Sequence, residues 1–165
     1  MPVGAAAGAS DALELLARER PDVVLLEPGL LDGDGIALCR HITAEGGAPR
    51  IILYAALPGD EVELLARVAG ASGLVDKAAA LDELFESIRR VARGDTALPP
   101  LTRDQLDAAA HRVEPDDLAV LAMLVDGTPA ADVAATLRLD DRRGLRQIDR
   151  VIGRLRRPPV TRTAA

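Results

Sequence analysis

Aromatic residues are almost absent from this chain. Tyr54 and Phe85 are the only two among 165 residues, and there is no tryptophan. Proteins that read single-stranded nucleic acid stack its bases on aromatic side chains, so this scarcity excludes that class of site. Cys39 is the single cysteine, which excludes a disulfide framework and a zinc site of several thiolates within one chain. His41 and His111 lack metal-binding spacing, and we expect no metal and no cofactor.

Long apolar runs are missing as well. No stretch approaches the ~20 apolar residues of a membrane-spanning helix, and no basic segment followed by an apolar run opens the chain. With one unpaired cysteine, this predicts a soluble, cytoplasmic protein without a membrane partner. Hydrophobic residues still make up 48% of the chain, so we expect a core of alanine, valine, leucine and isoleucine.

Charge is distributed unevenly along the chain. Residues 1–137 contain 11 basic and 23 acidic residues, whereas residues 138–165 contain nine arginines and three aspartates. The terminal segment therefore has a net charge of +6, although the whole chain has −6. Such an arginine-rich segment indicates a surface that binds phosphate groups.

The first two thirds of the sequence alternates short aliphatic runs with helical patterns, which is typical of a parallel α/β sheet. Buried strands are predicted over 23–26, 51–54 and 73–75, and helices over 11–20, 36–44, 60–69 and 81–92. Ser10 precedes the first helix and is a good N-cap. Asp32 and Asp34 lie in an Asp-Gly-Asp-Gly sequence, where both residue types are common turn formers.

A proline-containing segment separates this pattern from a purely helical one, predicted over 103–112, 115–125, 129–137 and 141–156. We predict an α/β domain over 1–95, a linker over 96–102, an all-α domain over 103–157 and a disordered tail over 158–165.

Three segments of the α/β domain carry a family pattern: RPDVVLLEPGLLDGDGIALCRHI, RIILYAA and AGASGLVDKAAALDELFESIRRVARG. They resemble the receiver domain of LuxR/NarL-type response regulators, from its second strand to its fifth helix. The resemblance implies a flavodoxin-like fold without the family's first strand and helix, and without the acidic pair that holds Mg²⁺. Because the first strand lies inside the sheet, its loss would expose a buried strand edge. A start site assigned too late, a strand from a partner chain and a rearranged sheet are three open explanations.

The same resemblance assigns the family's phosphorylation site residue by residue. It places the phosphoacceptor on Glu27, the hydroxyl residue on Tyr54 and the lysine on Lys77, and only the lysine matches. Glutamate carries its carboxylate one methylene further out than aspartate, which misplaces it for in-line phosphoryl transfer. We therefore expect a degenerate receiver in which Lys77 pairs with Glu27, and we interpret Asp32 and Asp34 as turn residues.

The segment VEPDDLAVLAMLVDGTPAADVAATLRLDDRRGLRQIDRVIGRL resembles the helix-turn-helix domain of the same family. The resemblance makes its last helix the recognition helix, with five DNA-binding candidates: Arg142, Arg143, Arg146, Arg150 and Arg154. The first, third and fourth of these recur every four residues and share one face, which suits the major groove. The other two are expected at phosphates or solvent.

Two residues of this helix depart from the family pattern. Gly144 costs roughly 1 kcal/mol relative to alanine within a helix. Asp149 would repel phosphate if it faced DNA. A charge-rich helix face paired to the acidic domain is therefore an open alternative to a DNA-binding face.

Three functions follow from these patterns. The leading one is a DNA-binding transcription regulator of the response-regulator type, not an enzyme, that binds double-stranded DNA as a homodimer without control by phosphorylation. The alternative is a protein-interaction module that dimerises with or antagonises an intact response regulator and does not bind DNA. A phosphotransfer enzyme or active phosphoreceiver is the third, and Glu27 argues against it.

Overall fold

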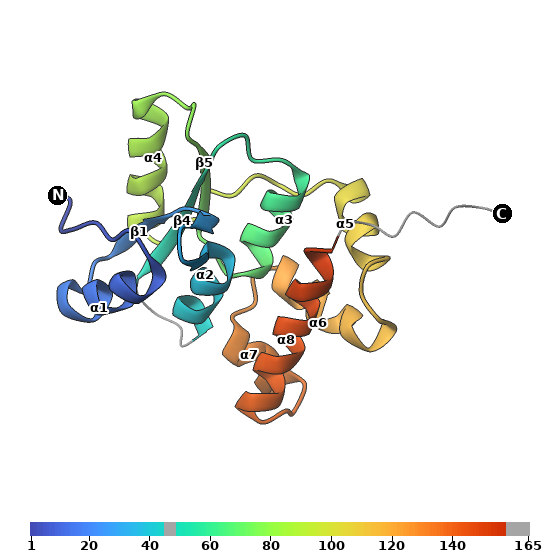
Figure 1. Ribbon diagram of the computed structural model, residues 1–165. Helices are drawn as coiled ribbons and strands as arrows, with labels where there is room; N and C mark the ends of the chain where they lie inside the picture. Colours follow the sequence, from blue (N-terminus) through green and yellow to red (C-terminus); the bar gives the residue numbers. More distant parts are fainter. Residues whose placement is uncertain (45–48, 158–165) are drawn as a thin grey trace.

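A computed structural model describes residues 1–44 and 49–157 (Figure 1). The first part of the chain forms α1 (Ala9–Glu19), β1 (Val23–Leu26), β2 (Gly29–Leu30), β3 (Gly33–Asp34), α2 (Gly35–Ala44), β4 (Arg50–Ala55), α3 (Asp60–Val68), β5 (Gly73–Asp76) and α4 (Leu81–Ala92). The second part is helical and forms α5 (Arg103–Ala110), the 3-10 helix η1 (Pro115–Asp117), α6 (Leu118–Val125), α7 (Ala130–Thr136) and α8 (Asp141–Leu155). The predicted tail over 158–165 lies outside the described residues.

The three aliphatic runs form a parallel sheet in the order β1-β4-β5. Strand β4 lies in the middle, and its Ile51, Ile52 and Leu53 are fully buried, as expected for a strand covered on both faces. Ile51 and Leu53 pack with α2 and α3, whereas Ile52 packs with α4 on the other face (Figure 1). The predicted α/β receiver fold followed by a helical part is confirmed.

The two edges of this sheet differ. Ala97, which follows α4, forms a parallel bridge with Gly73 and covers the edge of β5. Its amide donates to the Ser72 carbonyl at 2.7 Å, and its carbonyl accepts from the Leu74 amide at 3.1 Å. At the opposite edge, no further strand joins β1 within residues 1–44 and 49–157. Leu25 of β1 is 43% exposed, so this edge strand carries an apolar side chain that the described residues leave uncovered.

The N-terminus of α1 is capped from a distant loop. The prediction that Ser10 is the N-cap is wrong, because the helix begins at Ala9 and Ser10 lies inside it. The carboxylate of Asp32 accepts the Ala9 amide at 3.0 and 3.1 Å, which also places a negative charge at the positive end of the helix. A Cβ at Gly8 would lie 2.3 Å from Asp32 Oδ2, so a larger residue there would push the Asp32 side chain out of its capping position.

The two parts of the chain share one core. Buried residues of α2 and α3 and buried residues of α6 and α8 belong to the same apolar cluster, and α3 packs against both α6 and α8. Polar contacts reinforce the junction, because the Gln105 side chain of α5 donates to Asp60 and Glu63 of α3 at 3.1 and 2.8 Å. The helical part is therefore held against the sheet by buried apolar surface as well as by hydrogen bonds.

Candidate functional site

The three residues predicted as the remains of a phosphorylation site lie together at the carboxyl ends of the strands. Lys77 follows β5, and its Nζ lies 2.6 Å from Glu27 Oε1, which follows β1. The same Nζ lies 5.7 Å from the centre of the Tyr54 ring of β4, within reach of a cation–π contact. Glu27, to which the resemblance assigns the phosphoacceptor position, is thus already paired with the lysine.

Asp32 and Asp34 both serve as helix caps. Asp32 holds the start of α1, and Asp34 Oδ1 accepts the backbone amides of Ile36 and Ala37 at the start of α2, at 2.9 and 3.1 Å. Among the side chains that the structure describes, no three histidine, cysteine, aspartate or glutamate residues come together as a metal site. The contacts of Asp34 are local, as expected for a turn residue, whereas Asp32 caps a helix that lies 23 residues away.

Helix α8 begins at a capped N-terminus and packs closely on α7. Asp140 Oδ1 accepts the Arg143 amide at 2.9 Å, which makes it the N-cap. A Cβ at Gly144 would lie 2.4 Å from the Ala134 Cβ. The close approach of the two helices therefore explains a glycine whose cost in helix propensity was evident from the sequence.

The outward side of α8 carries arginines at its N-terminal half. Residues Ile148, Val151, Ile152 and Leu155 form the buried stripe of the helix. Arg142, Arg143 and Arg146 are exposed. Arg142 and Arg146 are one turn apart and lie opposite the buried stripe, as their spacing predicts.

Arg150 has an internal partner that the sequence did not predict. Its Nε and Nη2 donate to the two carboxylate oxygens of Asp117, both at 2.9 Å. The Asp117 side chain is 1% exposed and also accepts from Gln147 Nε2 at 3.0 Å. The hydrogen bonds from Arg150 lower the pKa of Asp117 below its usual value. No sequence signal singled out Asp117, because it follows another aspartate in a segment that looks exposed.

Arg154 also contacts an acidic residue of the helical part. Its Nη1 lies 2.8 Å from Glu114 Oε1. A contact between Arg154 and phosphate stays a prediction, as does a groove contact for Arg150. In the structure, these two arginines tie α8 to the segment before α6.

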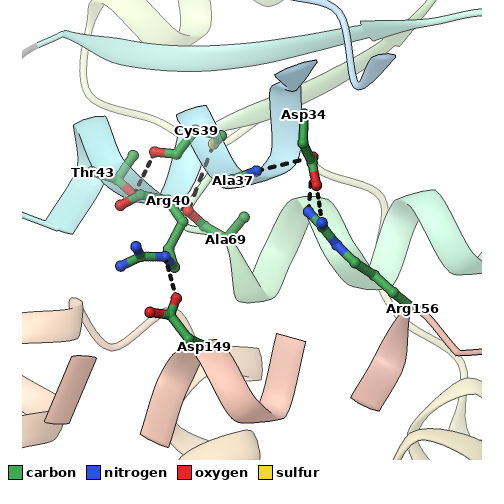
Figure 2. Close-up of polar contacts among 8 residues, drawn as sticks. All are labelled: Asp34, Ala37, Cys39, Arg40, Thr43, Ala69, Asp149 and Arg156. Atoms are coloured by element: carbon green, nitrogen blue, oxygen red, sulfur yellow. Dashed lines mark hydrogen bonds and ion pairs between the residues drawn. The ribbon is translucent and has the colours of Figure 1, made fainter. Parts of the chain in front are cut away.

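Two further ion pairs connect α8 and its C-cap with α2 and the residue that precedes α2 (Figure 2). Arg40 Nε lies 2.6 Å from Asp149 Oδ1. Arg156 forms a two-pronged contact with the carboxylate of Asp34, in which the Nη2–Oδ1 distance is 2.9 Å. The sequence could not predict these pairs, because their members are more than 100 residues apart.

The parallel sheet with its covering helices agrees with the family comparison. A family model described as the response regulator receiver domain matches residues 1–89. The chain belongs to the response regulator family. It also resembles the DNA-binding transcriptional activator DevR/DosR of Mycobacterium tuberculosis, with 28% identity over 163 residues that cover 93% of this chain and 75% of the relative.

The chain is also similar to a solved response-regulator structure and to an enzyme. A LuxR-family two-component response regulator from Aurantimonas sp. SI85-9A1 has a crystal structure with 34% sequence identity and a TM-score of 0.52, covering 66% of this chain and 76% of that one. A protein-glutamate methylesterase/protein-glutamine glutaminase of Myxococcus xanthus is 32% identical over 151 residues. The match covers 83% of this response regulator but 42% of that enzyme.

The helices of this response regulator are short. In the parts of the chain that the structure describes, none is long and apolar enough to cross a bilayer.

Proposed function

We propose that this response regulator is not an enzyme and regulates transcription by binding duplex DNA through α8. The observation that carries the proposal is the exposed group Arg142, Arg143 and Arg146 on a helix whose opposite side is buried. An α-helix fits the major groove, where arginine binds guanine edges and neighbouring phosphates. The relative from M. tuberculosis is named as a DNA-binding transcriptional activator, and the match to it extends over the helical part.

The test is a titration of a fluorescently labelled DNA duplex at two salt concentrations. The double variant Arg142→Ala/Arg146→Ala should bind roughly 10- to 100-fold more weakly at both salt concentrations, because both side chains are assigned to the major groove. Arg89→Ala/Arg93→Ala is the matched control, because it removes two exposed arginines from α4 and its C-cap. Equal affinity of both double variants and the wild type would exclude α8 as the DNA-binding helix.

We also infer that the receiver-like part works without phosphorylation. The ion pair between Lys77 and Glu27 supports this, because the positive charge of the lysine is already paired with a carboxylate of the same chain. The capping contacts of Asp32 and Asp34 support it further, because both carboxylates already accept backbone amides. A carboxylate held permanently at the lysine leaves no change of charge to act as a switch.

Incubation with acetyl phosphate and Mg²⁺ should therefore give no phosphorylated protein. Intact-mass spectrometry at neutral pH measures this directly, and an intact response regulator serves as the positive control. A phosphoryl group found on Glu27, Asp32 or Asp34 would contradict the inference.

A second function, protein interaction, is favoured by apolar side chains on the outer face of α4. Leu81 and Phe85 of this helix are 69% and 51% exposed, and α4 lies over β1, where Leu25 is also exposed. Such a surface fits a homodimer or a complex with an intact response regulator. Co-purification with that partner without a shift of any DNA would distinguish this function from the first.

A further inference from the structure

One acidic residue lies among the arginines of α8. Asp149 comes three residues after Arg146 and one before Arg150, and half of its side chain is exposed. A carboxylate on a helix that approaches DNA repels the phosphate backbone and offsets the attraction of a neighbouring arginine. The charge of Asp149 therefore opposes the DNA binding proposed above.

The sheet-containing part supplies the opposite charge at this position. Arg40 of α2 reaches across to Asp149, with 2.6 Å between Nε and Oδ1, and only 18% of its side chain is exposed. In Figure 2 its guanidinium points from α2 toward α8 and meets the carboxylate between the two helices. The pair thus cancels the negative charge with a residue from a different part of the fold.

Several contacts fix α2 in the position from which Arg40 reaches α8. Thr43 Oγ1 donates to the Ala69 carbonyl at 2.8 Å, and the buried Sγ of Cys39 contacts the same carbonyl at 3.6 Å. At the start of α2, Asp34 both caps the helix and binds Arg156 at the end of α8 (Figure 2). α2 also packs against α7, and residues of α2 and α8 belong to the same apolar cluster, so separating the two parts of the chain would expose buried apolar surface.

We propose that Arg40 is a positioning residue of the DNA-binding surface, which neutralises Asp149 so that α8 approaches phosphates with a positive face. The inference rests on the proposed function. It makes the receiver-like part a permanent component of the DNA-binding surface.

The experiment compares four proteins in a titration of a labelled mixed-sequence duplex of about three helical turns: wild type, Arg40→Gln, Asp149→Asn and the double variant. Arg40→Gln should bind roughly fivefold more weakly at low salt, because Asp149 then faces the phosphates without a partner. Asp149→Asn should bind at least as tightly as the wild type. The affinity of the double variant for the duplex should be within about twofold of that of Asp149→Asn, because no carboxylate remains at position 149.

Rescue in the double variant separates charge neutralisation from a structural role. Arg40→Gln and the double variant both lack the ion pair. If Arg40 acted only by holding the structure together, the double variant would bind DNA as weakly as Arg40→Gln. As a control, Arg93→Gln removes the same charge from the exposed C-cap of α4 and should leave the affinity for DNA within about twofold of the wild type.

Two results would overturn the proposal. One is absence of rescue in the double variant. The other is an Arg40→Gln protein that binds as tightly as the wild type or more tightly, and tighter binding would mean that α2 shields α8. The Arg142→Ala/Arg146→Ala protein, measured alongside, distinguishes these results from failure of the proposed function, because it weakens binding only if α8 is the DNA-binding helix.

Discussion

Replacing Arg150 by alanine should lower the free energy of unfolding by about 3 kcal/mol at neutral pH, because the change leaves a buried carboxylate without its cation. Asp117 is 1% exposed, and Arg150 provides two of its hydrogen bonds. Gln147 is the remaining side-chain donor, and one neutral amide does not balance a buried charge. Urea unfolding followed by circular dichroism measures the difference.

The double variant Arg150→Ala/Asp117→Asn is the control for this prediction. It removes the unpaired carboxylate and should regain part of the lost stability. A single variant that loses less than about 1 kcal/mol would contradict the assignment of Arg150 as the structural partner of Asp117.

The effect of Arg150→Ala should also depend on pH in a defined direction. Hydrogen bonds from Arg150 hold the pKa of Asp117 below its usual value in the folded protein. The pair therefore contributes its full stability above the unfolded pKa of about 3.9, and loses it as the pH falls through the lower folded pKa. The difference between wild type and variant should narrow as the medium becomes acidic, and a difference independent of pH would argue against this origin.

The strands and helices could be predicted from the sequence because their signals are local. The aliphatic run of β4 and the helical periodicity of α4 each lie within a dozen residues, and both elements are found where the patterns indicate. The small hairpin β2–β3 was missed, since two-residue strands leave no periodicity to detect. The cap of α1 was assigned to the wrong residue because its actual partner, Asp32, is 23 residues away.

Only those features of the candidate site that follow from strand topology or helical spacing could be predicted from the sequence. Parallel strands bring their carboxyl ends to one edge of a sheet, which is why Glu27 and Lys77 could be expected to meet. Helical spacing likewise places Arg142, Arg146 and Arg150 on one side of α8. Spacing does not reveal which arginine pairs with an acidic residue of the protein itself. Asp117 is 33 positions before Arg150, and only the tertiary packing brings the two together.

Replacing Gly35 by alanine should destabilise the protein by about 3 kcal/mol, at the upper end of what overpacking costs. A Cβ at this position would lie 1.8 Å from the Glu27 carbonyl oxygen and 2.8 Å from its carbonyl carbon. Both atoms belong to the backbone, so no side chain can rotate away. The loop after β1 and the start of α2 would have to separate, although the Gly35 amide donates to the Pro28 carbonyl at 2.9 Å.

The same loop provides two matched controls, which separate this clash from the general effect of replacing a glycine. A Cβ at Gly29 would meet nothing within 4 Å, and one at Gly33 would lie 3.7 Å from the Ala9 Cβ. Alanine at either position should be neutral or stabilise by up to about 1 kcal/mol, because it restricts the unfolded chain. Gly35 adjoins Asp34 at the start of α2. Its replacement should therefore also disturb the contact between Asp34 and Arg156 and weaken DNA binding. Alanine at Gly29 or Gly33 should have neither effect. Equal urea midpoints for all three variants would show that the loop and α2 are not packed as closely as the structure has them.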